Sequence, residues 1–226
     1  MTHTHKTIAI VGAGIVGVST ALWLQRAGHS VVLIDRNGPG EGASFGNGGV
    51  LAASGFVPAT GPGLIRSLPR MLLDRDAPLF LRWRHLPRAL PWLARYLSHC
   101  RAEDTARIAR AMAALTEDSL EEHRALSDGT PAARYLKPSD YLHVFPDRAA
   151  FDASADAWAL RREAGYDWHE MDSDALRAYD PAFSDATGFA VALPGHGHVT
   201  DPGAYVRALA DHAQALGARI VRADAT

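Results

Sequence analysis

The sequence predicts an α/β fold, in which a parallel sheet of strand–helix–strand units is interrupted by a segment with an antiparallel sheet. Residues 6–36 alternate an apolar strand, a helix and a second apolar strand. Residues 201–222 give one more helix and strand at the other end of the chain. Between them, residues 131–199 give short strands separated by turn residues, which is typical of an inserted α+β segment.

The composition is that of an ordinary globular protein. The 226 residues are 47% hydrophobic and 21% charged, and the formal net charge is -2, so bulk charge gives no indication of a nucleic-acid partner. Cys100 is the only cysteine, which excludes an internal disulfide and a cysteine-based metal site. No apolar run approaches the ~20 residues of a membrane span. No signal peptide precedes the first strand, and we expect a cytoplasmic location.

The first strand–helix–strand unit carries a glycine motif at its turn. Residues 8–11 form a short run rich in β-branched side chains, as expected of a strand buried on both faces. Three glycines follow in the spacing G-x-G-x-x-G: Gly12, Gly14 and Gly17. Apolar residues then recur at helical period (Ile15, Val18 and Leu22). Gly28 ends this helix, Val31–Ile34 is a second buried strand, and Asp35 stands at its carboxyl end.

Each residue type in this unit suits the diphosphate and ribose of a dinucleotide. Gly12 permits the tight turn, Gly14 lets a pyrophosphate approach the backbone, and Gly17 lets the helix pack close to the strand. The helix N-terminus offers unpaired N–H groups and a partial positive charge. Asp35 can accept hydrogen bonds from both ribose hydroxyls and would repel a 2′-phosphate, which argues against a phosphorylated nicotinamide cofactor. A glycine turn in another kind of strand–helix–strand unit is the alternative, but strands, helix and acid at this spacing favour the dinucleotide.

A long glycine-rich loop follows the second strand, from Arg36 to Gly49. Loops of this length are unusual unless they are functional. Its glycines let backbone amides converge on a ligand, and Ser44 and Asn47 add side-chain donors. A flexible linker is the alternative. We favour a ligand-binding loop because it directly follows the dinucleotide unit.

Three segments of the chain resemble one family of flavoproteins. They are the strand–glycine–helix–strand unit, the loop Ser44-Phe-Gly-Asn-Gly-Gly-Val50, and the run from Pro62-Gly-Leu-Ile-Arg through Leu86-Pro-Arg-Ala-Leu-Pro-Trp-Leu93. Over nearly its whole length the chain is similar to the FAD-dependent D-amino-acid dehydrogenases, which belong with glycine oxidase and D-amino-acid oxidase in a wider superfamily. The resemblance implies that the cofactor is FAD and that the substrate is a D-amino acid or a close relative such as glycine.

The resemblance also implies which residues bind the cofactor. The glycine motif and Asp35 would hold the ADP half of FAD. Ser44, Asn47 and Gly48 would lie near the pyrophosphate or the flavin. The full set of predicted cofactor-binding residues is Gly12, Ala13, Gly14, Ile15, Val16, Gly17, Asp35, Arg36, Ser44, Asn47 and Gly48.

The resemblance divides the chain into three parts. A Rossmann-like FAD-binding domain comprises residues 1–60 and 200–226. A helical cover comprises residues 61–130. An α+β substrate domain comprises residues 131–199, and in the family its antiparallel sheet lies over the flavin.

Residues 64–100 alternate short apolar helical pieces with prolines, each of which ends or kinks a helix near itself. Large apolar and basic side chains are interleaved there: Arg82, Trp83, Arg84, Arg88, Trp92, Leu93, Arg95 and Leu97. This mixture suits a peripheral contact with the inner face of the membrane, or with a quinone or another electron carrier. We favour the alternative, a helical cover with its arginines in water, because the prolines break any long amphipathic face.

From residue 101 onward helical and strand patterns alternate. The predicted elements are one helix over residues 101–127, a hairpin with strands at 134–136 and 141–145, one helix over 149–165, a strand at 167–171, a helix at 174–179 and a strand at 188–193. Ile108, Met112 and Leu115 are the expected buried stripe of the first helix, and its acids, Glu117, Asp118, Glu121 and Glu122, are expected in water.

A glycine and histidine loop is predicted over residues 194–203. His196 and His198 could be a metal pair or an acid/base. We favour a turn with two exposed imidazoles, because no neighbouring ligand spacing supports a metal. Asp201 then suits the N-cap of a helix that Gly217 ends, and residues 219–222 add a strand to the parallel sheet. The expected buried stripe of that helix is Tyr205, Leu209, His212 and Leu216.

The predicted reaction is oxidative deamination, in which the substrate α-carbon gives a hydride to flavin N5 and the imino acid then hydrolyses. Asp140, His143 and Asp185 are polar candidates for catalysis, but structural or surface roles are favoured for all three. The catalytic residues are therefore left unassigned.

Family members continue for about as much again beyond Thr226, as the resemblance implies. We expect an N-terminal fragment or one part of a split enzyme, with a second chain carrying the remaining strands and the ligand of the substrate carboxylate. One alternative is a non-catalytic subunit that binds the ADP moiety or a partner chain. Another is a nicotinamide-dependent enzyme, against which the loop at residues 38–49 argues.

Overall fold

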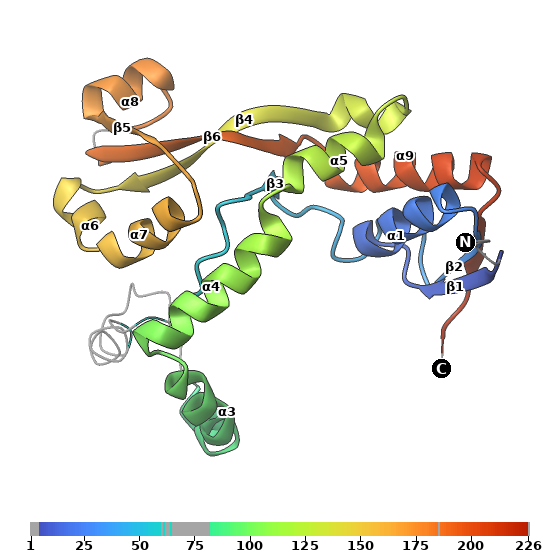
Figure 1. Ribbon diagram of the computed structural model, residues 1–226, viewed down its shortest axis with the longest axis horizontal. Coiled ribbons are helices and arrows are strands. Elements are labelled where there is room, and N and C mark those ends of the chain that lie inside the picture. The colour runs from blue at the N-terminus through green and yellow to red at the C-terminus, as the bar shows by residue number, and fades with distance from the viewer. Residues whose placement is uncertain (1–4, 60, 62–63, 65–81, 185, 226) are drawn as a thin grey trace. The chain divides into compact units, whose positions relative to one another are not determined.

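The computed structural model describes residues 5–59, 61, 64, 82–184 and 186–225. The chain divides into two compact units, whose elements are labelled in Figure 1. Unit 1 comprises Met1–Ala52, Asp118–Leu142 and Ala192–Thr226, and unit 2 comprises Ala53–Glu117 and His143–Val191. Both units are discontinuous in sequence, so each is held together by contacts between segments that lie far apart in the chain.

Unit 1 contains a three-stranded parallel sheet. Its strands are β1 (Thr7–Val11), β2 (Ser30–Asp35) and β7 (Arg219–Arg222), in the order β1-β2-β7. Val11 pairs with Ile34, and Asp35 pairs with Arg222, so the carboxyl ends of the three strands meet at one edge. The predicted addition of residues 219–222 to the parallel sheet is confirmed.

Helices α1 (Ile15–Arg26) and α9 (Pro202–Ala215) pack with this sheet in the main hydrophobic core. Leu22, Leu33 and Leu209, from α1, β2 and α9, are fully buried there. The prediction that the first strand is buried on both faces is wrong. Ile10 packs against the core, but the opposite face of the strand, with Thr7, Ala9 and Val11, is exposed, and Val11 is 71% exposed.

Helix α9 begins and ends where the sequence predicts. The Asp201 carboxylate accepts a hydrogen bond from the Ala204 N–H at 2.9 Å, and Gly217 follows the helix with φ +96°. The predicted buried stripe is wrong at Leu216, which is exposed because it lies just past the last helical residue. The residues of this helix that are buried are Gly203, Tyr205, Val206, Leu209, Ala210 and Ala213.

Residues 101–127 form two helices where the sequence predicts one. They are α4 (Ala102–Thr116) in unit 2 and α5 (Ser119–Ser127) in unit 1. The chain leaves the helical conformation at Asp118, whose ψ is +14°. The predicted surface acids of this region are all exposed, which confirms that expectation.

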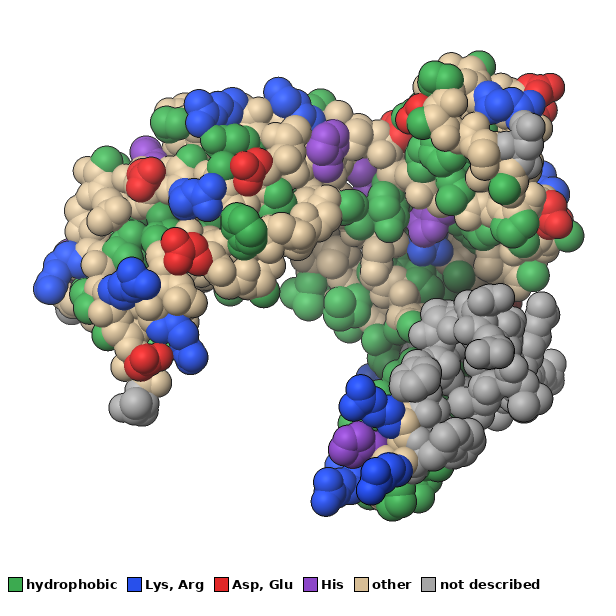
Figure 2. All heavy atoms as spheres, turned by 180° about the vertical axis from the view of Figure 1, so that it is seen from behind, with side chains coloured by type: hydrophobic (Ala, Val, Ile, Leu, Met, Phe, Trp, Pro, Cys, Tyr) green, Lys and Arg blue, Asp and Glu red, His purple; other side chains and the backbone are tan. Residues whose placement is uncertain are grey.

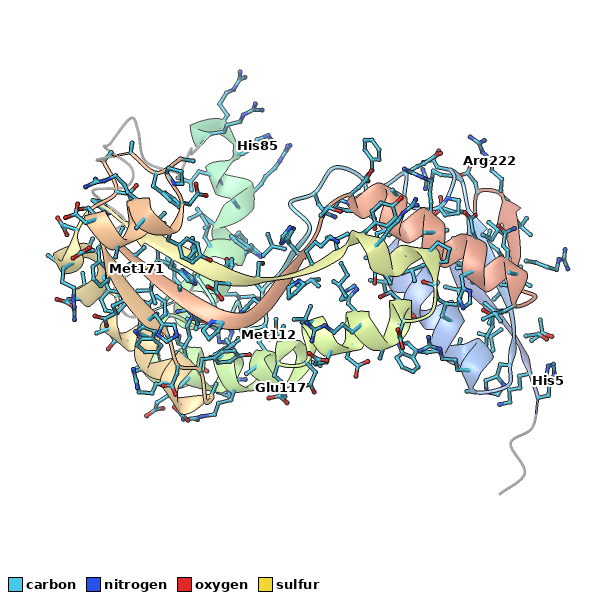
Figure 3. The ribbon with its side chains drawn as sticks, turned by 90° about the horizontal axis from the view of Figure 1, so that it is seen from above. His5, His85, Met112, Glu117, Met171 and Arg222 are labelled. Atoms are coloured by element: carbon cyan, nitrogen blue, oxygen red, sulfur yellow. The ribbon has the colours of Figure 1, made fainter. Side chains whose placement is uncertain are left out.

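The buried side of α4 also differs from the prediction. Leu115 is 80% exposed and Met112 is exposed too; Figure 3 marks Met112 on this helix. Its buried residues are small: Thr105, Ala109 and Ala113. The prediction follows the helical spacing of the larger apolar side chains, whereas the helix packs closely through its smaller ones.

The second sheet contains the strands β3 (Val50–Leu51), β6 (Phe189–Val199) and β4 (Leu136–Phe145) in this order, with β5 (His169–Asp172) also paired to β6. Strand β3 runs antiparallel to β6. The predicted antiparallel sheet is confirmed, but β4 and β6 are longer than predicted. β4 and β6 each have residues in both units.

The predicted hairpin around residues 137–140 is wrong. Residues 136–145 form the single strand β4, and Arg134 and Tyr135 belong instead to a 3-10 helix, η2 (Pro131–Tyr135). Pro138 lies within the strand. This is tolerated because β4 is the last strand in the order of the described sheet, and an edge strand can spare a backbone donor.

Unit 2 has its own aromatic core. Its helices are η1 (Trp83–His85), α3 (Leu86–Ser98), α4, α6 (Arg148–Asp152), α7 (Ala155–Glu163) and α8 (Ser173–Tyr179). Phe151 and Trp158 are buried, with ring centroids 5.2 Å apart, and the ring centroids of Phe151 and Phe189 also lie 5.2 Å apart. The single helix predicted over residues 149–165 is wrong, because the chain breaks between α6 and α7.

Helix α3 runs through Pro91, so of the two predicted effects of a proline, ending or kinking a helix, this one does not end its helix. None of the described side chains of α3 is buried. Figure 2 shows basic side chains gathered near it, and the exposed residues there include Arg82, Arg84, Arg88 and Arg95. Prolines 69 and 78 lie outside the described residues.

Cys100, just after α3, is buried. Within the described chain, no helix is both long enough and apolar enough to span a membrane.

Candidate dinucleotide-binding site

The turn from β1 into α1 has the backbone geometry that its glycines predict. Gly12 has φ +104°, a conformation that only glycine adopts readily, and its N–H bonds to the Ile34 carbonyl at 2.8 Å. A Cβ on Gly17 would lie 1.9 Å from the Gly12 carbonyl oxygen, so the helix and the turn approach too closely for a side chain. Gly14 is less restricted, because its Cβ would meet only the Ser44 Oγ at 3.1 Å.

Asp35 faces this turn. Its Oδ2 accepts the Ala13 N–H at 2.7 Å, and its Oδ1 accepts the Asn37 N–H at 2.8 Å. The bond from Ala13, followed by that from Asn37, lowers the pKa of the Asp35 carboxyl below its ordinary value. The carboxylate is therefore charged at neutral pH and stands at the carboxyl edge of the sheet, beside the glycine turn.

The N-terminus of α1 offers backbone donors next to Asp35. The Ile15 N–H bonds to the Ser44 Oγ at 2.9 Å, and Ser44 is buried. Val16, the next residue, is 77% exposed, so this first helical turn is accessible from outside. No acidic side chain lies in the turn. The arrangement suits an anion, because N–H groups and the helix dipole point the same way.

The glycine-rich loop is closed by its own polar groups. The Asn47 Oδ1 accepts the Gly49 N–H at 2.8 Å, and the Asn47 Nδ2 donates to the Ala43 carbonyl at 3.2 Å. The Gly49 carbonyl accepts the Val199 N–H at 2.7 Å, and a Cβ on Gly49 would lie 2.2 Å from the Val199 carbonyl oxygen. These contacts hold the loop against the start of the second sheet.

Two of the predicted cofactor-binding residues, Gly48 and Arg36, make few contacts with the other predicted site residues. Gly48 has only the Val50 side chain near the position of a Cβ, at 3.7 Å. Arg36 is mostly exposed and lies 3.4 Å from the Asp224 carboxylate, while its carbonyl accepts a bond from the Arg222 side chain at 3.1 Å. The structure therefore brings together the glycine turn, Asp35 and Ser44, and places Arg36 at the outer end of the sheet edge.

A cavity of about 180 Å³ adjoins the N-terminus of α1 within unit 1. It is lined by Ile15, Ser44, Asn47, Gly49, Val50, Leu51, His123, Val199, Pro202, Tyr205 and Val206. Sequence reasoning missed His123 and assigned Tyr205 only to a buried stripe. The two side chains come from α5 and α9, 82 residues apart in sequence, so no local pattern could pair them.

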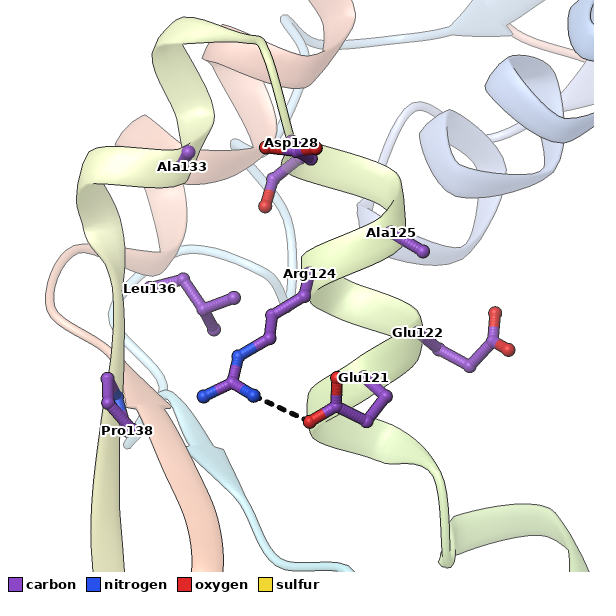
Figure 4. A pocket seen from close by; sticks show the side chains of 9 residues that line it. Glu121, Glu122, Arg124, Ala125, Asp128, Ala133, Leu136 and Pro138 are labelled. Atoms are coloured by element: carbon purple, nitrogen blue, oxygen red, sulfur yellow. Dashed lines mark hydrogen bonds and ion pairs between the residues drawn. The ribbon is translucent and has the colours of Figure 1, made fainter.

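The larger cavity of Figure 4, about 630 Å³, lies elsewhere in unit 1 and contains none of the predicted site residues. Glu121 and Arg124 on α5 form an ion pair at its wall, 2.6 Å apart. Both side chains are exposed, and this kind of surface pair on one helix contributes little to stability. The residues around this cavity include no group typical of cofactor binding.

Two of the three catalytic candidates, Asp140 and His143, do not line the cavity beside α1. Asp140 and His143 are partly buried on β4, and the His143 ring packs edge-on against Trp158 at 5.0 Å. Asp185 lies outside the described residues. The catalytic residues stay unassigned.

The two histidines of β6 are not exposed as predicted. His196 is 2% exposed, its ring stacks on Tyr141 with centroids 5.6 Å apart, and its Nδ1 lies 3.0 Å from the Pro194 carbonyl. His198 is partly buried with its Nδ1 3.2 Å from the Ser139 Oγ. The prediction failed because residues 194–199 continue a strand of the sheet. The described residues contain no cluster of three or more histidine, cysteine or acidic side chains that could hold a metal ion.

Comparisons with known proteins agree with this geometry. The family model described as DAO, FAD dependent oxidoreductase, matches residues 7–226. A D-amino-acid oxidase of Bradyrhizobium diazoefficiens is 40% identical over 98% of this chain and 53% of its own length. A D-amino acid dehydrogenase 2 of Ralstonia nicotianae is 38% identical over 80% of this chain and 43% of its own length.

Solved structures show the same fold at lower identity. Glycine oxidase from Bacillus cereus has a TM-score of 0.56 and 20% identity, over 96% of this chain and 46% of its own. Glycine oxidase from Geobacillus kaustophilus has a TM-score of 0.57 at the same identity. The chain spans about half the length of the curated relatives it matches.

Proposed function

Because the chain belongs to the DAO family of FAD-dependent oxidoreductases, we propose that it takes part in the oxidative deamination of D-amino acids. The observation that carries this proposal is the 40% identity to a D-amino-acid oxidase, which extends over 98% of the chain. The second named relative is a dehydrogenase for the same class of substrate. The non-catalytic alternative is not favoured, since these relatives carry the names of enzymes.

The residues around the turn from β1 into α1 fit FAD. Gly17 cannot carry a side chain without meeting the Gly12 carbonyl, which gives the close helix–turn contact of a dinucleotide site. The charged Asp35 would accept the hydroxyls of the adenosine ribose with its remaining lone pairs. The exposed first turn of α1, at Val16, would face the diphosphate, and Ser44 and Asn47 would hold the adjoining loop in place.

FAD held there would supply the redox chemistry: it would take the hydride of the substrate α-carbon, and the imino acid would then hydrolyse to a keto acid and ammonia. The described residues of this chain contribute binding and orientation. Asp35 would hold the ribose of the ADP moiety, and the N-terminus of α1 would hold its diphosphate. The Asn47–Gly49 turn, pinned to Val199, holds the loop beside it in place, which reduces the entropy cost of binding.

We also propose an electron acceptor and a role for the surface of helix α3. We propose a quinone or another electron carrier as the electron acceptor. For helix α3 we propose the role of a helical cover with its arginines in water; a weak peripheral membrane contact through the exposed Trp92, Arg88 and Arg95 is the alternative.

Anaerobic mixing of the FAD-loaded protein with D-alanine tests the proposed reaction. We expect the flavin absorbance to bleach with D-alanine and to stay unchanged with L-alanine, the matched control. Bound flavin that no D-amino acid reduces, in the presence of any chain that completes the site, would contradict the proposal while leaving FAD binding intact.

A further inference from the structure

We infer that His123, held in place by Tyr205, binds the ribityl segment of FAD, between the diphosphate and the flavin ring. This inference rests on the proposed use of FAD. The two side chains line the 180 Å³ cavity beside the N-terminus of α1. Neither a sequence motif nor the family description assigns a role to His123 or to Tyr205. A cavity of this size holds one segment of a dinucleotide rather than a whole one.

The position of the cavity indicates which segment of FAD it receives. Asp35, at the ribose end, does not line the cavity, whereas Ile15 and Ser44, at the helix N-terminus, do. A dinucleotide with its adenosine ribose at Asp35 and its diphosphate at the first turn of α1 would continue past Ser44. The next part of FAD along that direction is the ribityl chain, which carries hydroxyl groups.

The hydrogen bonds of the pair leave one ring nitrogen of His123 for a ligand. The His123 Nδ1 lies 3.0 Å from the Tyr205 hydroxyl, and no described residue bonds to the His123 Nε2. Where the Tyr205 hydroxyl donates to Nδ1, the ring proton is on Nε2, which is then a donor. In the other tautomer Nε2 is an acceptor. A ribityl hydroxyl can both donate and accept, so it matches Nε2 in either state.

Burial favours a neutral, well-oriented imidazole at this position. Burial lowers the pKa of His123 and raises the pKa of Tyr205 to about 12, so both groups are uncharged at neutral pH. Tyr205 is 1% exposed and its ring lies 5.6 Å from that of His123. The remaining lining is largely apolar, so the imidazole is one of few polar groups that a ligand would meet there.

A purely structural role predicts a different result from a ligand contact, and two ligands separate them. FAD has the ribityl segment and ADP lacks it. The affinities of the full 226-residue chain for FAD and for ADP are measured by titration calorimetry in wild type, His123→Ala, His123→Gln and Tyr205→Phe. His212→Ala on α9 is the matched control, because His212 is partly buried but does not line the cavity.

We expect His123→Ala to weaken FAD binding about 3- to 10-fold, the range for one lost neutral hydrogen bond, and to leave ADP binding unchanged. His123→Gln restores part of the loss, because its amide reaches toward the position of Nε2. Tyr205→Phe gives a smaller loss for FAD alone, since only the orientation of the imidazole changes. The control has no effect on either ligand.

Equal losses for FAD and ADP would overturn the inference, because they would report damage to the unit rather than a ribityl contact. Unchanged FAD affinity in both His123 variants would overturn it too, as would a wild type that binds ADP and FAD equally tightly or binds neither. Failure of the D-alanine test with the FAD-specific loss still present would refute the proposed reaction but not this contact.

Discussion

At residue 35 one carboxylate bonds to two backbone N–H groups, those of Ala13 and Asn37. The same side chain is the group that we propose for the ribose. Both bonds favour the charged form, and the Ala13 bond has the larger effect on the pKa. The Asp35 carboxylate thus holds the turn at Ala13 in place before any ligand binds. Ordering this turn therefore adds no entropy cost to ligand binding.

This geometry predicts a pH-dependent contribution of Asp35 to stability. Because the folded-state pKa is lowered, the stabilisation is fully present above the unfolded-state pKa of about 3.9 and is lost as the pH falls through the lower folded-state value. Asp35→Asn, which keeps the shape without the charge, should reduce the free energy of unfolding at neutral pH.

Urea unfolding of wild type and Asp35→Asn over a pH series measures this difference. We expect it to shrink as the pH falls below about 4. Asp211→Asn, at an exposed position on α9, is the control. A difference between wild type and Asp35→Asn that stays constant over the series would show that the charge is not the cause.

Single residues were predictable from the sequence where their role is local. Gly12, Gly17 and Asp201 have roles set by neighbours a few residues away, and the structure confirms their geometry. His196 was not predictable, because its burial depends on Tyr141 in another strand. The same is true of the His123 and Tyr205 pair.

At the scale of elements, helix α9 shows how much one cap contributes. The Asp201 carboxylate satisfies the Ala204 N–H, one of the donors that every helix leaves unpaired at its start. The helix supplies several side chains of the main core. A weaker cap therefore loosens the helix on which the main core is built.

Removing this cap should be measurable. Asp201→Ala is expected to lower the free energy of unfolding by about 1 kcal/mol, because the Ala204 N–H loses its acceptor. Asp211→Ala, in the exposed middle of the same helix, should change it by less than about 0.5 kcal/mol. Chemical denaturation followed by circular dichroism measures the free energy of unfolding of both variants. Equal losses in the two variants would mean that the lost hydrogen bond of the cap is not the cause.

The elements that the sequence predicted best are those with a glycine or a cap at each end, such as α1 and α9. The prediction failed at the boundary between α4 and α5, where no strong breaker stands and only the backbone at Asp118 changes. It failed in the opposite way at β4, where Pro138 indicated a break but the strand continues through it. Size of side chain also misled the prediction for α4, because packing selected alanines over leucine and methionine.

At the scale of the whole molecule, the cores of the two units differ in composition. The core of unit 1 is mainly aliphatic, with side chains from the parallel sheet, α1 and α9, and Tyr205 among its buried members, whereas unit 2 contains a cluster of aromatic rings around Phe151 and Trp158. The α/β class and the presence of two sheets followed from the alternation of patterns in the sequence. The membership of the units did not, because strands β4 and β6 contribute to both.

Because the proposed FAD contacts lie in unit 1, ligand binding should protect that unit. Ligand at 100 times its Kd stabilises the bound state by about 2.7 kcal/mol. We expect saturating FAD to slow amide hydrogen exchange in peptides from α1 and α9, with a smaller change in peptides from α7. Mass spectrometry of the exchanged protein measures this, with riboflavin as the control ligand that lacks the ADP moiety. Uniform protection of both units, or protection of α7 first, would contradict the placement of the site.

The thiol of Cys100 is 3% exposed and lies 3.7 Å from the Tyr96 carbonyl oxygen. Alkylating dyes react with thiolates that water can reach, so this sulfur should label slowly in the native state. A second cysteine engineered at an open loop position such as Gly42, where an added Cβ meets no atom within 4 Å, would then take up a fluorophore selectively. The wild-type background thus already suits single-site labelling, and movements of the loop could be followed by fluorescence without first replacing the native sulfur.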